Sequence, residues 1–358
     1  MFQVFTTASV IDRFVDSYGN HECDWLDILS LQSDIFYSGR TEKWEENPED
    51  PWFIVSQAGP DFINCSDYID SLKEHPERVL EHPDSAFILD IDEESAKHIE
   101  QDYGVICLPA SKVNSLCKVS KREQAWILCT GDSSDDDLPI RHNWGDILGK
   151  DMCRYPSNAM ILVDRNFFGE YNKYTNEFVC VEGLKDLLNT VLPKSLKCEY
   201  QVLIVYEQGL HHMQRNVSLE TEEDFISYNE KHISDYLACL REYPILVKLL
   251  AVAPARGKID EDFKYHKNLF NRTHNRRSVT NYYILKADYS FAPFYNTGRV
   301  RAEQDIHQEF IYSSFQERQI CDLAIRGKKR IVELVQDVLN GNPIFYSCNN
   351  PIENRLIL

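Results

Sequence analysis

The sequence predicts an α/β protein built as an N-terminal α/β domain followed by a second α/β domain. Three observations support this. A length of 358 residues suits two domains. The segment Ala86–Leu108 has a buried strand pattern, a helix pattern and a second strand pattern in about 23 residues, which is typical of a parallel βαβ unit. Apolar strand-like runs then alternate with amphipathic helices through the second half.

The N-terminal domain is expected to span residues 1–150. Its expected elements are a strand at Phe2–Thr6, a helix at Ser9–Ser17, a polar loop at 40–52, and then the βαβ unit, with a strand at Ala86–Ile91, a helix at Glu93–Tyr103 and a strand at Val105–Leu108. Gly104 stands where a helix ends in a left-handed residue. The charged stretch Gly131–Asp137 and the Pro156 segment place the boundary within 131–157.

The second domain is expected to span residues 151–358. Its expected elements are strands at Ala159–Val163, Gln201–Tyr206, Ile245–Val252 and Asn281–Leu285, and helices at Val181–Leu192, Glu222–Tyr243 and Phe315–Asn340. Pro193, Pro244 and Gly341 follow the three helices as stop signals. Arg326, Lys328, Lys329 and Arg330 are expected on the outer faces of the last helix.

Composition indicates a folded cytoplasmic protein. Apolar residues make up 43% and aromatic residues 12% of the chain, enough for a core. No apolar run approaches the roughly 18 residues that span a bilayer, and no secretory signal pattern is visible. The eleven cysteines contain no C-x-x-C pair and are expected to be reduced thiols.

Charge is unevenly distributed along the chain. The net charge is −19, yet residues 254–331 hold fifteen Lys and Arg against nine Asp and Glu, so this segment is near +6 and the remainder near −25. This asymmetry favours an acidic body with a basic face. An ordinary solvated helix surface is the alternative interpretation.

The basic segment contains His274, Arg276 and Asn281 at the spacing H-x-R-x4-N. An imidazole can act as a nucleophile near neutral pH, and a guanidinium binds phosphate oxygens with two donors. If the segment is extended, His274 and Arg276 point the same way and line one cleft. Arg277 and Lys286 would strengthen its positive field.

This spacing resembles the H-x-K-x4-D half-motif of the phospholipase D-like superfamily, over roughly Ser157–Phe291. The resemblance implies a phospholipase D-like α/β sandwich, a nucleophilic His274, a phosphate-binding Arg276 and a supporting Asn281. Arg replaces Lys, Asn replaces Asp, and the Gly-Ser pair after the family motif is absent. Because the chain holds one half-motif, a catalyst built from it would be a homodimer. A group of uncharacterised bacterial proteins with a similar His-x-Arg-x4-Asn-Tyr element suggests a role in antiviral defence.

Asp164 and Arg165 follow a buried strand, where α/β sites gather, and both are expected to contribute to substrate binding. Asp164 is expected either to pair with Arg276 or to replace the missing carboxylate. An internal ion pair or a helix cap is the simpler interpretation. Asp92 resembles a magnesium ligand in Asp90-x-Asp92 but suits the N-cap of the next helix better. His211-His212 and the Asp132–Asp137 run lack metal-ligand spacing. We therefore expect no metal and no cofactor.

Tyr282, Tyr283, Tyr289, Phe291, Phe294 and Tyr295 interleave with Lys286, Arg299 and Arg301. Such a set suits base stacking on single strands, although an ordinary strand pair explains it equally well. The sequence thus favours a protein that binds DNA, RNA or another phosphodiester, as a metal-independent nuclease or without cutting. The alternative is a non-enzymatic adaptor whose acidic N-terminal domain binds a protein partner.

Overall fold

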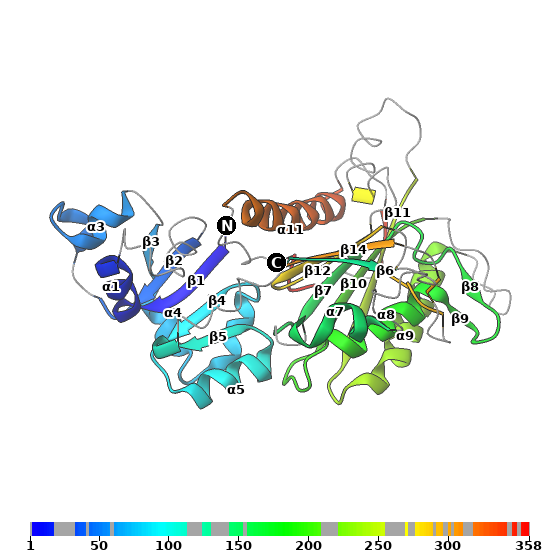
Figure 1. Cartoon of the computed structure of the whole chain (residues 1–358), viewed down its shortest axis with the longest axis horizontal. Helices are drawn as coiled ribbons and strands as arrows, with labels where there is room; N and C mark the ends of the chain where they lie inside the picture. Colours follow the sequence, from blue (N-terminus) through cyan, green and yellow to red (C-terminus); the bar gives the residue numbers. More distant parts are fainter. Residues whose placement is uncertain are drawn as a thin grey trace, which may run out of the picture. The chain divides into compact units, whose positions relative to one another are not determined.

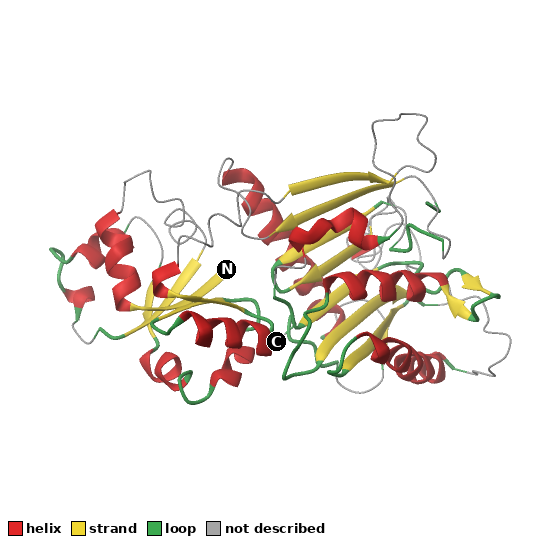
Figure 2. Cartoon of the chain, turned by 60° about the horizontal axis from the view of Figure 1, so that its bottom comes forward, coloured by secondary structure: helices red, strands yellow, loops and turns green. Residues whose placement is uncertain are grey.

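The computed structural model shows an α/β protein (Figures 1 and 2). It describes residues 2–17, 33–40, 43–57, 61–112, 124–129, 143–152, 156–208, 221–254, 269–270, 276–288, 291–295, 300–301, 304–310, 318–341, 346–348 and 352–357. Two compact units divide the chain: Met1–Glu123 with Phe310–Ile325, and Gln124–Glu309 with Arg326–Leu358. The sequence instead placed one boundary near residue 150.

A five-stranded parallel sheet forms the first unit, in the order β3-β2-β1-β4-β5. The strands are β1 (Phe2–Thr7), β2 (Ser33–Ser38), β3 (Phe62–Asn64), β4 (Ala86–Leu89) and β5 (Ile106–Pro109). From β1 the chain moves to β2 and β3 on one side and later returns to β4 and β5 on the other. This reversal puts helices on both faces, because parallel crossovers are right-handed.

Helices cover each face of this sheet. On one face Val10, Ile11 and Phe14 of α1 (Ala8–Ser17) are buried with Trp52 of α3 (Pro51–Ser56). The other face buries Phe5 and Phe87 in a cluster with apolar residues of the following elements. These elements are α4 (Ser66–Ser71), η2 (Pro76–Glu81) and α5 (Glu93–Tyr103). The short helices η1 (Trp44–Glu46) and η3 (Ala110–Lys112) belong to the same unit.

The βαβ prediction is confirmed, with the helix as expected; β4 ends at Leu89 instead of Ile91, and β5 begins at Ile106 instead of Val105. Helix α5 spans Glu93–Tyr103, and its N-cap Asp92 accepts hydrogen bonds from the Ser95 amide at 2.8 Å and hydroxyl at 2.7 Å. Such a cap satisfies amides that have no partner within the helix. Gly104 ends the helix with φ of 66°, a left-handed conformation that favours glycine.

The second unit contains an eight-stranded mixed sheet in the order β15-β11-β10-β7-β12-β13-β14-β6. Strands β7, β10 and β11 are parallel, and β12 runs antiparallel to β7. The strands are β6 (Gln124–Cys129), β7 (Ala159–Val163), β10 (Tyr200–Glu207), β11 (Ile245–Val252), β12 (Arg276–Thr280), β13 (Tyr283–Ala287), β14 (Gln304–Phe310) and β15 (Tyr346–Ser347). A separate small hairpin joins β8 (Tyr171–Asn172) to β9 (Glu177–Phe178).

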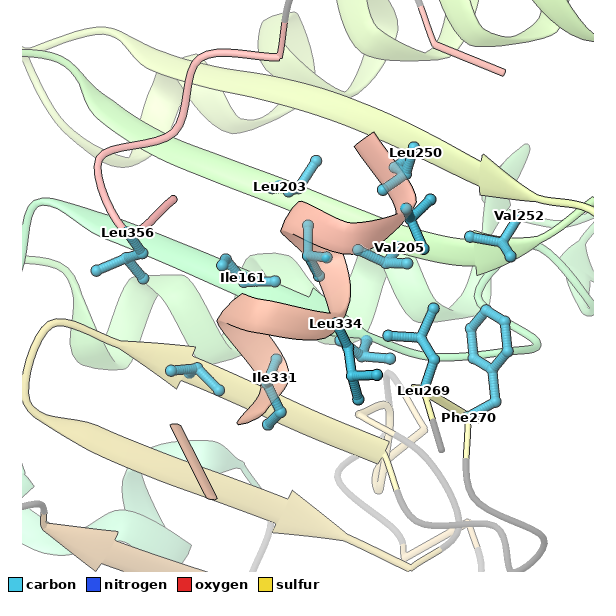
Figure 3. Packing of buried hydrophobic residues seen from close by; sticks show 14 of the residues in the cluster. Ile161, Leu203, Val205, Leu250, Val252, Leu269, Phe270, Ile331, Leu334 and Leu356 are labelled. Carbon is cyan, nitrogen blue, oxygen red and sulfur yellow. The ribbon is translucent and has the colours of Figure 1, made fainter. Parts of the chain in front are cut away.

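Helix α11 (Arg318–Leu339) covers one face of this sheet (Figure 3). Its residues Ile331, Leu334, Val335 and Val338 pack into one cluster with apolar residues of the central strands and with Leu356. Residues three, four and seven apart lie on one face of a helix, so this spacing makes the stripe that seals the core. Gly341 follows with φ of 76°.

The crossover helices line the opposite face (Figure 1). They are α8 (Val179–Val191) and α9 (Glu222–Leu237), with α7 (Trp144–Met152) beside α8 and η4 (Ala238–Leu240) after α9. Phe168 is packed edge-on against Phe178, Tyr206 and Phe225, at ring-centre distances of 4.8 to 5.0 Å. One aromatic cluster thereby joins the hairpin, strand β10 and helix α9.

Three sequence expectations need correction. The predicted strand Asn281–Leu285 begins instead at Tyr283, and a strand, β12, precedes it. The predicted helix to Tyr243 ends its α-helical part at Leu237. Lys328, expected on an outer face, is 6% exposed because its ammonium donates to the Asn281 carbonyl oxygen.

Candidate functional site: a buried ion pair and a basic cluster on β12

Asp164 and Arg276 form an ion pair at the carboxyl end of β7. Arg276 is the first residue of β12, and the antiparallel register places Arg277 opposite Val163, the last residue of β7. The Arg276 Nε atom donates to Asp164 Oδ1 at 3.2 Å, and its Nη1 atom donates to the Asp288 carbonyl oxygen at 3.3 Å. Of the alternatives that the sequence left open for Asp164, the structure shows the internal ion pair with Arg276.

Burial dominates the electrostatics of this pair. Asp164 is 1% exposed, and burial raises the pKa of its carboxyl group, while the Arg276 charge acts in the opposite direction. The carboxylate also accepts from the Asn166 amide at 3.0 Å, and the Cys180 thiol lies 3.9 Å away. Because both side chains are buried and paired with each other, we interpret the Asp164–Arg276 pair as a structural ion pair and not as an open phosphate-binding site.

Arg165, predicted to bind substrate, is held by Glu207 at the carboxyl end of β10. Its Nε and Nη2 atoms donate to the two carboxylate oxygens at 2.7 and 3.0 Å. The Glu207 side chain is 4% exposed, while that of Arg165 is 52% exposed. This two-donor geometry is the same one a phosphate would use, so a ligand would have to compete with Glu207 for Arg165.

Arg277 and Lys286 lie directly opposite each other on β12 and β13. Strand alternation turns Arg277 away from Arg276, to the sheet face that carries Val279 and packs against α11. Burial lowers the pKa of Arg277, and the nearby charge of Arg330 on α11 lowers it further. Two like charges opposite each other destabilise a sheet. We call Arg277, Lys286 and Arg330 the basic cluster.

No carboxylate among the described residues forms a hydrogen bond or ion pair with Arg277. Arg277 is half-buried, and Arg330 is exposed. A partly desolvated guanidinium with a second guanidinium nearby favours the arrival of an anion. Arg330 was visible in the sequence as part of a basic helix face, but its proximity to Arg277 depends on how α11 lies on the sheet.

Asn281 lies at the other end of β12 from Arg276, in the two-residue turn between β12 and β13. It is fully buried. Its Oδ1 atom accepts from the Asn158 amide at 2.9 Å, the Ala159 amide at 3.2 Å and the Ser157 hydroxyl at 3.2 Å. Its Nδ2 atom donates to Asn158 Oδ1 at 3.0 Å.

The structure thus separates residues that the sequence motif suggested would meet. Five residues of strand at about 3.3 Å each separate Arg276 from Asn281 by roughly 16 Å. The family resemblance grouped these two residues in one site, whereas the structure places them at opposite ends of β12. His274 lies in 271–275, outside the described residues.

Other predicted features have mixed outcomes. Tyr282, Tyr283 and Phe291 are buried, as the strand-pair interpretation requires, and Tyr295 is 48% exposed beneath the Arg301 guanidinium at 4.4 Å. Among the described residues no His, Cys, Asp and Glu side chains gather as a metal site. The His211-His212 pair and the Asp132–Asp137 run lie outside the described residues.

No family model matches the sequence, and no curated protein matches it. No helix among the described residues has the length and apolar character needed to cross a membrane. The fold and the site therefore define an α/β protein with a basic cluster on its second sheet, and function has to be argued from that cluster.

Proposed function

We propose that the second unit binds DNA or RNA through the basic cluster of Arg277, Lys286 and Arg330. The observation that supports this is the position of Arg277, half-buried, opposite Lys286 and close to the charge of Arg330. Phosphate is the anion that suits it, because a guanidinium forks onto two phosphate oxygens. The excess of basic residues across 254–331 in an otherwise acidic chain supports the same ligand class.

Binding through phosphates has a signature that binding through apolar contacts lacks. Each phosphate contact releases counterions, so the logarithm of the binding constant falls linearly with the logarithm of the salt concentration. For a single strand the slope is about −0.7 for each phosphate contact. Fluorescence anisotropy with a labelled single-stranded DNA or RNA of about 20 nucleotides, at KCl concentrations from about 50 to about 300 mM, measures this slope directly.

The decisive variants are Arg277→Gln and Arg330→Gln. Each should weaken binding and reduce the slope by about 0.7 to 1. Lys231→Gln is the matched control, because Lys231 is exposed on α9, on the other side of the sheet, and loses the same charge. Equal slopes in all three variants, or no binding at 50 mM KCl, would refute the proposal.

Cleavage is a further step of the same proposal and depends on His274. A phospholipase D-like reaction would need no metal, would require two copies of His274 and would proceed through a phosphohistidine. Activity that survives EDTA and disappears in His274→Ala, in a protein that runs as a dimer in light scattering, would support it. Intact substrate after incubation with a binding-competent protein would restrict the function to binding.

An adaptor function is the second candidate, favoured by the net charge near −25 outside residues 254–331. An acidic surface of this kind suits a basic protein partner. A partner that co-purifies with the Arg277→Gln/Arg330→Gln protein as well as with the native protein would support the adaptor. Loss of that partner together with nucleic acid would instead assign it to the basic cluster.

A further inference from the structure

The first unit contains a cavity of about 460 Å³, and none of its lining residues belongs to the basic cluster. Its lining includes Asp12 and Asp16 of α1, Gly39 and Arg40 after β2, and Asp50 and Trp52 at the start of α3. The cavity therefore opens beyond the carboxyl ends of β1 and β2. Ligands of parallel α/β sheets bind at that end of the strands.

One wall of the cavity is fixed by a hydrogen-bond network. Asp50 is the N-cap of α3, accepting from the Trp52 amide at 2.9 Å, and it also accepts from Arg40 Nη2 at 2.6 Å. The Arg40 guanidinium lies 4.5 Å above the Trp52 ring, and the Trp52 indole donates to Asp12 Oδ1 at 2.9 Å. A wall tied in this way is pre-organised for a ligand.

The charge in the cavity is not balanced. Arg40 neutralises Asp50, whereas Asp12 is bonded to a neutral indole and no cation among the described residues contacts Asp12 or Asp16. Two carboxylates four residues apart on one helix repel each other, and a cation between them would relieve that repulsion.

Size and spacing narrow the class of cation. A cavity of about 460 Å³ lies in the range of small organic ligands, about 300 to 1,000 Å³, and far exceeds the roughly 30 Å³ of one water molecule. Residues four apart on a helix hold their Cβ atoms about 5 to 6 Å apart. Two ammonium groups joined by three or four methylenes span a similar distance.

We propose that this cavity binds an aliphatic diamine, with one ammonium at Asp12 and the other at Asp16. The methylene chain would lie along Val15 and the edge of Pro51, which also line the cavity. Ammonium–carboxylate bonds are charge-assisted and give most of the affinity. A lysine side chain of a protein carries only one ammonium, so the spacing of the two carboxylates favours the free diamine.

Isothermal titration calorimetry of the full chain tests the proposal, with 150 mM NaCl to screen unspecific attraction. Putrescine should bind at least about tenfold more tightly than butylamine or a capped lysine peptide, because only it uses both carboxylates. Asp16→Asn should reduce putrescine affinity to the butylamine level. Asp70→Asn, an exposed aspartate on α4 outside the cavity, should leave it unchanged.

Three results would overturn the proposal. Equal affinity of putrescine for the native and Asp16→Asn proteins would remove Asp16 from the site. MgCl₂ binding that displaces putrescine at lower concentration would make the cavity a metal site. Tighter binding of the lysine peptide than of putrescine would make it a protein-docking site. Thermal unfolding of the free variants shows first that each one is folded.

Discussion

The Arg276 guanidinium lies 3.2 Å from the Asp164 carboxylate, and each side chain is at most 10% exposed. The first residue of β12 is thus tied to the residue that follows β7. A buried pair of this kind adds little net stability when complete, because desolvation offsets attraction. Removing one partner is different, since it leaves a charge in a dry environment.

Arg276→Met should therefore destabilise the protein by about 3 to 5 kcal/mol. Without the guanidinium, burial is opposed only by the hydrogen bonds from the Asn166 amide and the Cys180 thiol. The pKa of Asp164 should therefore rise further, and the loss of stability should be larger at pH 8 than at pH 5. Urea unfolding of the variant at the two pH values measures both effects.

The double variant Asp164→Asn/Arg276→Met supplies the control. Its amide keeps an acceptor for the Asn166 backbone and carries no charge. We expect it to be more stable than Arg276→Met by at least about 2 kcal/mol, as a double-mutant cycle of a coupled pair requires. Simple additivity of the two substitutions would contradict the view that an unpaired charge is the cause.

Glu100, in the first unit, should make the stability of the protein depend on pH. Its Oε2 atom accepts from the Cys107 amide of the edge strand β5 at 3.5 Å, and burial raises the pKa of Glu100 from 4.5 to about 7. Between about pH 4.5 and pH 7 the Glu100 carboxyl group is therefore protonated in the folded protein and ionised in the unfolded chain. Stability from this group is complete below pH 4.5 and declines as the pH rises to 7.

Glu100→Gln should abolish that decline and raise stability at pH 8, by up to about 3 kcal/mol. The amide oxygen of glutamine can still accept from Cys107, and it needs no proton. Urea titrations at pH 5, 6, 7 and 8 test this, and Glu74→Gln is the control because Glu74 is exposed. An unchanged slope in Glu100→Gln would place the pH dependence elsewhere.

Gly183 in α8 lies close to the backbone of Phe291 and Ala292. A Cβ atom there would lie 2.4 Å from the Phe291 carbonyl oxygen and 2.6 Å from Ala292 Cα. Gly183→Ala should destabilise by about 2 kcal/mol or more, although alanine is the better helix former. In Gly327→Ala the nearest atom is the flexible Ile284 Cδ1 at 3.3 Å, so that control should be nearly neutral.

Local patterns allowed much of the fold to be predicted from the sequence. The strand Ile245–Val252, the helix Glu93–Tyr103 and its Gly104 terminus agree with the structure, because apolar periodicity and end signals are local. Strand β12 was missed for the opposite reason. Its sequence Arg-Arg-Ser-Val-Thr is mostly polar and lacks the apolar pattern of a buried strand. Arg276 can be buried in this strand because Asp164, 112 positions earlier in the chain, pairs with its charge.

The candidate site shows the same limit. Pairing with Arg276 was one of the alternatives that the sequence left open for Asp164, and the structure shows it. It also grouped Arg276 with Asn281 by motif spacing, whereas a five-residue strand carries them to opposite ends. Sequence spacing gives the identity of the side chains but not the point at which the chain turns, and here Asn281 makes the turn without a glycine.

Asn281 therefore allows a direct test of the motif. If it supported a reacting histidine, as the family's aspartate does, Asn281→Asp would restore the family pattern and raise activity or phosphate affinity. The geometry predicts otherwise. Asn281 bonds Asn158 and its neighbours about 16 Å from Arg276, so the change should leave nucleic-acid affinity the same within about twofold.

The same substitution should cost stability. The introduced carboxylate would lack the donor to Asn158 Oδ1 and would place a charge where the native Asn281 side chain is fully buried. We expect a loss of about 2 to 4 kcal/mol, which grows as the pH rises because a buried carboxyl group resists ionisation. Fluorescence anisotropy and urea unfolding of the same Asn281→Asp preparation measure its nucleic-acid affinity and its stability separately. Increased affinity or cleavage in Asn281→Asp would show that the turn belongs to the site after all.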